Sequence, residues 1–156
     1  MKKALKEIKC GFGLGNLKFG MTKAEVKLIL GEPSYIDKYS HSDSANDLTE
    51  SWQYDEFEIS ISFDEEEAWK LTMISVNSGF YEFKGKSLIG KSEKDVLAHL
   101  NIEDTYLEDV SERDGENHKV IEIDEKSINF WFIDGVLDEI QWSPLFIDDD
   151  TIKWPK

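Results

Sequence analysis

The chain of 156 residues contains an internal duplication, and this repeat constrains its fold more than any other feature. The segment GMTKAEVKLILGEP at 20–33 returns as GKSEKDVLAHLNIED at 90–104, at an offset of 70 residues. Three later pairs of segments follow in the same order: 35–43 with 106–114, 54–63 with 123–132, and 70–76 with 136–142. Because a chance match would not keep one order four times, we infer a tandem repeat whose turns differ in length.

Each repeat is predicted to begin with a short helix. Thr22 or Ser92 can accept a backbone N–H at the helix start, and Glu25 or Asp95 three residues later completes a capping-box pattern. Apolar residues then recur at helical spacing. Gly31 predicts the end of the first helix, and Asn101 holds the equivalent position in the second.

Alternating apolar and polar residues predict strands after each helix. Ile59, Ile61 and Phe63 alternate with charged or small residues in the first repeat, as Ile128, Phe130 and Phe132 do in the second. Asp134-Gly135 is the sharpest turn signal. The same alternation predicts a core from both repeats: Trp52, Tyr54, Ile59, Ile61 and Phe63, with Ile121, Ile123, Ile128, Phe130 and Phe132.

These elements predict an α+β protein. We expect two tandem helix-plus-four-strand repeats that form one antiparallel sheet, with the helices on one face and the other face wet. The expected division of the chain is 1–16 as an N-terminal segment, 17–78 as the first repeat, 79–86 as a linker, 87–143 as the second repeat and 144–156 as a surface tail.

The stretch FGMTKAEVKLILGEPSY at 19–35 resembles the start of small outer-membrane assembly lipoproteins of the SmpA/OmlA type. Their mark is a Gly-Met-Thr helix start, a Val and an LGxP stop. A tandem duplication of such units is similar to the β-lactamase inhibitor protein fold, and small acidic domains of this kind also occur among bacterial immunity proteins. The matching residues are structural, so the resemblance implies a fold and not an activity. The second repeat lacks the Met and the GxP stop, and from the residues at the N-terminus we expect neither an export signal nor a lipid-bearing cysteine.

The net charge of −15 indicates which kinds of macromolecule the protein can bind. A nucleic-acid binder normally carries the opposite sign, so we expect no nucleic-acid partner, and we expect a basic protein instead. No apolar run approaches the length of a membrane span, so we expect no membrane partner. A single cysteine cannot form an internal disulfide, and we expect a cytoplasmic protein.

No motif in the chain carries recognisable chemistry. His41, His99 and His118 lack the spacing of metal ligands, and the acidic stretch with Asp43, Asn46 and Asp47 lacks the glycine and distal glutamate of a calcium loop. Cys10 has no nucleophile motif around it, and GFGLG at 11–15 resembles a phosphate loop only by its glycines. We therefore predict no enzyme, no catalytic residue, no metal and no cofactor.

The wet face of the sheet is the predicted binding site. Trp131, a large aromatic residue ringed by polar groups, fits the anatomy of a binding hot spot. With it we assign Glu58, Glu122, Asn129, Glu139 and Gln141 by alternation, and Glu65, Glu66 and Glu67 as an acidic hairpin tip. The predicted function is a non-catalytic protein-binding module of the immunity type that neutralises a basic protein toxin. The alternative is an intracellular structural or scaffold domain that associates with itself. The sequence leaves the oligomeric state open.

Overall fold

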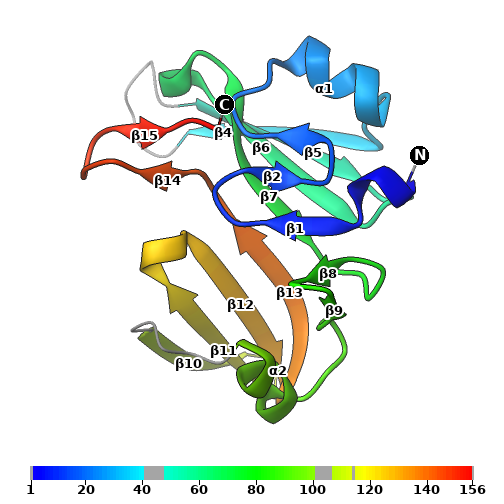
Figure 1. The fold of residues 1–156 in the computed structure, drawn as a ribbon, viewed down its shortest axis with the longest axis vertical. Coiled ribbons are helices and arrows are strands. Elements are labelled where there is room, and N and C mark those ends of the chain that lie inside the picture. Colours follow the sequence, from blue (N-terminus) through cyan, green and yellow to red (C-terminus); the bar gives the residue numbers. More distant parts are fainter. Residues whose placement is uncertain (1, 41–47, 101–106, 114, 156) are drawn as a thin grey trace.

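The structure is a computed structural model that describes residues 2–40, 48–100, 107–113 and 115–155. Its largest element is an eight-stranded sheet in which every neighbouring pair of strands is antiparallel (Figure 1). The strands lie in the order β10 (Leu107–Arg113), β11 (Glu116–Ile123), β12 (Ile128–Ile133), β13 (Val136–Trp142), β7 (Lys70–Val76), β6 (Ile59–Asp64), β5 (Leu48–Tyr54) and β4 (Tyr35–Ser40).

A second sheet joins two segments that are far apart in the sequence. Five short strands lie in the order β3 (Leu17–Lys18), β2 (Gly13–Leu14), β1 (Glu7–Lys9), β8 (Glu82–Phe83) and β9 (Lys86–Ser87). The pair β1–β8 is parallel and the others are antiparallel, so the sheet is mixed. A separate hairpin, β14 (Leu145–Phe146) with β15 (Ile152–Lys153), follows the last long strand.

The described ranges also contain two α-helices of eight residues each, α1 (Lys23–Leu30) and α2 (Glu93–Leu100), and three short 3₁₀ turns: η1 (Lys2–Leu5), η2 (Glu65–Glu67) and η3 (Asp124–Lys126). The capping box predicted for α1 is confirmed, because Thr22 and Glu25 each accept the other's backbone N–H. Gly31 ends this helix with a positive φ of 80°. At α2, Ser92 Oγ accepts the Asp95 N–H. The predicted stop at Asn101 lies outside the described residues.

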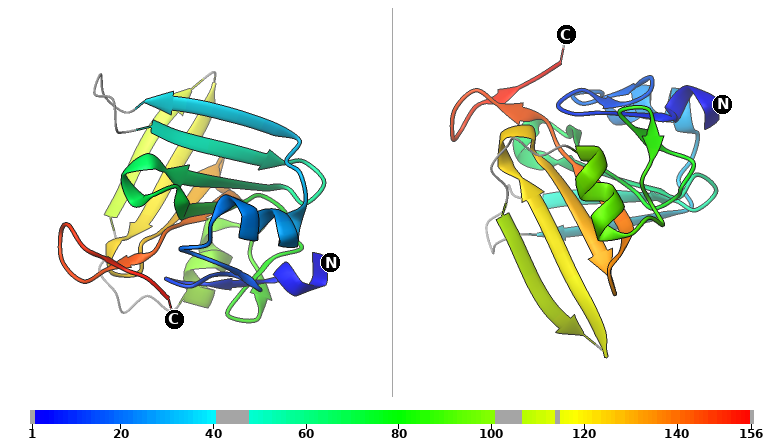
Figure 2. Two further views of the ribbon diagram at one scale, coloured as in Figure 1. Left: turned by 90° about the horizontal axis from the view of Figure 1, so that it is seen from above. Right: turned by 60° about the horizontal axis from the view of Figure 1, so that its bottom comes forward.

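The hydrophobic core lies between the eight-stranded sheet and the elements packed on one side of it. The ten residues predicted as core from the two repeats are all buried, and that prediction is confirmed. Val26 and Leu30 of α1, Val96 and Leu100 of α2, and Phe83 of β8 belong to the same cluster. Figure 2 shows α1 and the N-terminal strands stacked against the long strands. We call this side of the large sheet the covered face.

The N-terminal glycines allow tight backbone packing in the five-stranded sheet. Gly15 has a φ of 55°, and a Cβ atom there would lie 1.8 Å from the carbonyl oxygen of Ala4. Side chains are therefore excluded at this position for two reasons, the backbone conformation and the lack of space. The glycine-rich stretch at 11–15 is thus part of a packed sheet and not a phosphate loop.

The predicted fold class is wrong. The chain is mostly β, and it is not two helix-plus-four-strand repeats, because a five-stranded mixed sheet forms from the expected N-terminal segment, the start of the first repeat and the expected linker. The strands of that sheet have two or three residues each. Elements this short contain no measurable alternation, so the sequence pattern did not reveal them.

Candidate binding face

The opposite side of the eight-stranded sheet, which we call the open face, is lined by polar residues. One row of paired residues crosses six strands in register: Gln53, Ser60, Ser75, Gln141, Asn129 and Glu122. All are partly exposed except Ser75, which is buried. Their neighbours along each strand point to the covered face and are buried and apolar. The sheet therefore separates an apolar core from a polar surface.

Trp131 lies on this open face beside an acidic side chain. It pairs across the strands with Glu139, whose carboxylate accepts a hydrogen bond from Ser75 Oγ at 2.5 Å. The Trp131 side chain is partly exposed, and its buried indole N–H has no hydrogen-bond partner among the described residues. Packing alone holds the ring in place, so a contact with another molecule could move it without breaking a hydrogen bond.

A second acidic group is fixed at one end of the open face. Asp64 accepts hydrogen bonds from Thr49 Oγ1 at 2.7 Å and from Thr72 Oγ1 at 2.9 Å. Both threonines are buried, and they come from the strands on either side of β6. Two hydroxyl groups thus orient this carboxylate.

Two hollows adjoin each other around Phe146, whose side chain is 56% exposed. The first, of about 320 Å³, reaches the open face through Met73, Asn129 and Gln141. The second, of about 340 Å³, has five carboxylates in its wall and is called the acidic hollow: Asp64, Glu66, Glu67, Asp149 and Asp150. Apolar atoms of Phe146 and Ile152 complete it. Such a mixture suits the aliphatic stem and cationic head of Lys or Arg.

The structure brings most of the predicted site residues to these surfaces. Glu122, Asn129, Trp131, Glu139 and Gln141 lie on the open face, and Glu66 and Glu67 line the acidic hollow. Glu65 shares the 3₁₀ turn η2 with them, and its carboxylate accepts the Leu48 N–H. Glu58 is the exception. It lies in the turn before β6 with a φ of 55°, because that strand begins at Ile59 and not earlier.

The edge strand β4 lies within the predicted repeat segment 35–43, but none of its residues was assigned to the binding site. Tyr35 and Asp37 pair with Gln53 and Ser51, and Tyr39 pairs with Thr49, so alternation places all three on the open face. Tyr35 is 63% exposed and Tyr39 is 42% exposed. The signal was present in the sequence as YIDKY, where the two tyrosines and the aspartate alternate with Ile36 and Lys38.

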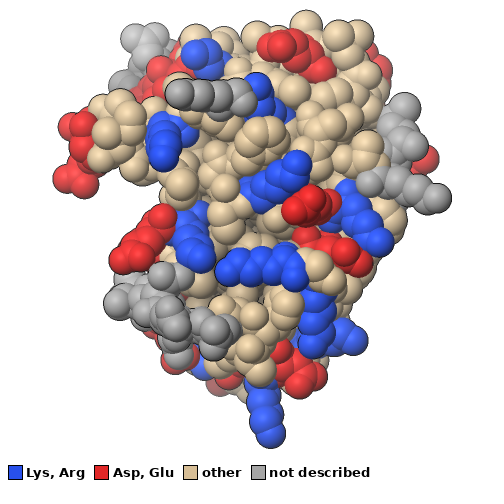
Figure 3. Space-filling view, in the orientation of Figure 1, with Lys and Arg blue, Asp and Glu red and all other residues tan. Residues whose placement is uncertain are grey.

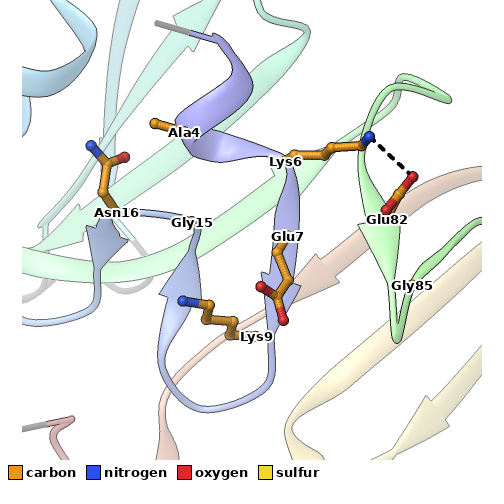
Figure 4. A pocket seen from close by; sticks show the side chains of 8 residues that line it. All are labelled: Ala4, Lys6, Glu7, Lys9, Gly15, Asn16, Glu82 and Gly85. Atoms are coloured by element: carbon orange, nitrogen blue, oxygen red, sulfur yellow. Dashed lines mark ion pairs between the residues drawn. The ribbon is translucent and has the colours of Figure 1, made fainter.

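A third hollow lies on the five-stranded sheet and has a volume of about 640 Å³ (Figure 4). Its charges are balanced, because Lys6 Nζ pairs with the Glu82 carboxylate at 3.3 Å and strand β1 carries both Glu7 and Lys9.

The histidines and acidic residues of the chain form no metal site in the described ranges. His99 Nε2 lies 2.9 Å from the Phe83 carbonyl oxygen, and this hydrogen bond ties α2 to β8. His41 and the acidic stretch with Asp43 lie outside the described residues. Within the described ranges, no three His, Cys, Asp or Glu side chains converge on a metal position.

Comparison with protein-family models, curated proteins and solved structures finds no match for this chain. The resemblance to outer-membrane assembly lipoproteins and to the β-lactamase inhibitor protein fold therefore stays an expectation from the sequence. No helix in the described part of the chain is both long and apolar enough to cross a membrane.

Proposed function

We propose that this chain is a non-catalytic binding protein that takes a basic protein partner on its open face. The observation that carries the proposal is the row of polar residues across six strands, five of them partly exposed, with Trp131 beside Glu139. A polar surface around a partly exposed aromatic residue is typical of protein-binding sites.

Charge supports the choice of a basic partner. The open face carries Glu122 and Glu139, and the adjoining acidic hollow adds five carboxylates. The whole chain has a net charge of −15, so its field attracts a basic protein before contact is made. Within this proposal we place the protein in the cytoplasm, where its activity is that of an immunity-type inhibitor that covers a basic toxin enzyme.

The test begins with capture of partners from the native cell on wild-type protein and on two variants. Trp131→Ala removes the proposed anchor, and Leu28→Ala is the matched control, since Leu28 is an apolar residue of α1 and is 87% exposed. The partner should be a basic protein that is retained by wild type and Leu28→Ala. Its affinity for Trp131→Ala should fall by about 30-fold or more, which corresponds to about 2 kcal/mol.

Binding kinetics with the purified partner then distinguish long-range charge attraction, which sets the association rate, from the direct contacts that set the dissociation rate. Charge reversal of Glu65, Glu66 and Glu67 to Lys should slow association and weaken its dependence on salt, while dissociation changes little. Normal binding by Trp131→Ala would refute the site. Self-association that strengthens as salt is added, measured by sedimentation, would favour the scaffold alternative, because salt screens repulsion between two acidic surfaces.

A further inference from the structure

A fourth hollow, of a different chemical kind, lies on the side of the C-terminal hairpin opposite the acidic hollow. It has a volume of about 660 Å³ and is lined by the turn after β1 and by the chain from β14 to the C-terminal end. We call it the apolar groove. Its wall is formed mainly by six side chains: Cys10, Phe12, Leu145, Ile147, Ile152 and Trp154.

The groove exists because the hairpin packs closely on two N-terminal glycines. A Cβ atom at Gly11 would lie 2.7 Å from Leu145 Cγ, and one at Gly20 would lie 3.1 Å from Trp154 Cε3. The two ends of the hairpin segment are therefore held against the N-terminal chain. Between them, Ile147 is left 68% exposed, so apolar surface faces solvent where the groove is open.

The charged residue in the lining of the groove is basic. Lys153 is exposed and belongs to the lining, and Lys9 Nζ lies 5.0 Å from the centre of the Phe12 ring. No Asp or Glu belongs to the lining among the described residues. The carboxylates of Asp149 and Asp150 instead line the acidic hollow on the opposite side of the hairpin. Figure 3 shows Lys and Arg side chains interspersed with Asp and Glu on this side of the molecule, with uncharged surface between them.

The pKa of the Cys10 thiol reflects the burial and the positive charges around it. Burial raises its pKa above the ordinary value, while the positive charges of Lys126 and Lys84 act in the opposite direction. The thiol is thus placed among apolar atoms and within reach of cationic fields. It is also the only cysteine in the chain, which makes it a specific probe of the groove.

From this geometry we propose that the apolar groove binds an anionic amphiphile, a medium-chain fatty carboxylate. Its chain lies along Phe12, Leu145 and Ile152, and its carboxylate pairs with Lys153 at the open end. The volume falls within the range of small-molecule sites. Charge selects the occupant, because Lys153 in a lining without carboxylates favours an anion, although the protein as a whole repels one.

The first experiment measures alkylation of Cys10 by iodoacetamide in the full chain, with fatty acids kept below their micelle concentrations. Dodecanoate should slow the reaction at least about tenfold at saturation. The affinity should rise about fourfold for each added methylene from octanoate to dodecanoate, as expected for burial of apolar surface. Dodecylamine, which has the same chain and the opposite charge, should protect poorly.

Pairs of matched variants test whether dodecanoate binds in the apolar groove. Ile147→Glu places a carboxylate on the groove and should lower dodecanoate affinity at least about tenfold. Phe146→Glu is the control, because Phe146 is the exposed neighbour that lines the hollows on the other side. Lys153→Gln should weaken dodecanoate severalfold, whereas Lys94→Gln on α2 should have no effect. Circular dichroism confirms that each variant is folded.

Four results would overturn the proposal. They are absence of protection by dodecanoate, equal protection by dodecylamine, equal effects of Ile147→Glu and Phe146→Glu, or protection only by an apolar peptide that ends in a free carboxylate. The last result would identify the occupant as a protein tail and not a fatty acid. None of these outcomes depends on the open face, so this proposal and the proposed function fail separately.

Discussion

Glu50 is a charged residue on the covered face that contacts several elements, and its replacement by Gln tests how α1 is held to the sheet. The residue is 9% exposed. Its carboxylate accepts a hydrogen bond from Trp52 Nε1 at 2.7 Å, and it pairs with Lys23 Nζ at 2.9 Å and Lys38 Nζ at 3.6 Å. Lys23 is the first residue of α1, so one carboxylate joins the helix, the edge strand β4 and the strand β5.

The expected cost of Glu50→Gln at pH 7 is about 1–2 kcal/mol of unfolding free energy. Removal of one partner from a fully buried ion pair costs about 3–5 kcal/mol. Here the two lysines are 31% and 51% exposed and regain water when the charge is lost, which lowers the cost. The amide oxygen of Gln can also keep the hydrogen bond from Trp52. Urea denaturation of wild type and variant measures the difference, and Glu122→Gln on the open face controls for loss of one negative charge.

The pH dependence of this difference has a definite sign. Burial raises the pKa of Glu50, but hydrogen bonds from Lys23 and Trp52 and the charges of Lys23 and Lys38 outweigh it, so the pKa lies below its ordinary value. The unfolded chain therefore takes up a proton at Glu50 before the folded chain does as pH falls. The stabilisation is complete above the unfolded pKa of about 4.3 and is lost as pH falls through the lower folded pKa.

The stability difference between wild type and Glu50→Gln should thus be constant from pH 7 to about pH 5 and shrink below about pH 4. A difference that stays the same down to pH 3 would show that the effect comes from the shape of the amide and not from the charge. A difference below about 0.3 kcal/mol at pH 7 would refute the role of Glu50 as a link between α1 and the sheet.

Two further predictions concern the core and the join between the sheets. Ile61→Ala and Phe130→Ala should each cost about 2–5 kcal/mol in denaturant melts, since both side chains are fully buried; values under about 0.5 kcal/mol would contradict the assigned face. Trp142→Phe should cost about 1–2 kcal/mol and increase amide exchange in β2, because it removes the hydrogen bond from Trp142 Nε1 to the Gly13 carbonyl at 3.1 Å. Unchanged exchange in β2 would show that this bond does not hold the N-terminal sheet.

The sequence predicted those parts of the fold that have long periodic patterns. Alternation over six residues identified the buried faces of β6 and β12, and the capping box located the start of α1. Glu58 shows the limit of the same reasoning. Alternation extended back from Ile59 places it on a strand, but the chain turns there with a positive φ that no pattern of polarity reports.

The five-stranded sheet and the C-terminal hairpin could not be read from the sequence. Their strands are too short for periodicity, and their positions depend on contacts between residues more than a hundred positions apart, such as Gly11 with Leu145 and Gly13 with Trp142. The apolar groove was missed for the same reason, because its two walls come from opposite ends of the chain. Glycines at 11–15 were the available signal, but glycines alone do not show which segment of the chain packs against them.

The small sheet also explains how the two halves of the large sheet stay together. Strands β7 and β13, which join the halves, are paired over only three residues: Ile74 with Trp142, Ser75 with Gln141, and Val76 with Ile140. Most other strand pairs of the large sheet are paired over six or more residues. The covered face bridges this short junction. Trp142 binds Gly13, Phe83 packs edge-on against Phe130 at 5.8 Å, and the Tyr81 hydroxyl donates to the Phe57 carbonyl. On the open face, the hydrogen bond from Ser75 Oγ of β7 to the Glu139 carboxylate of β13 crosses the same junction, so both faces of the sheet help to hold its halves together.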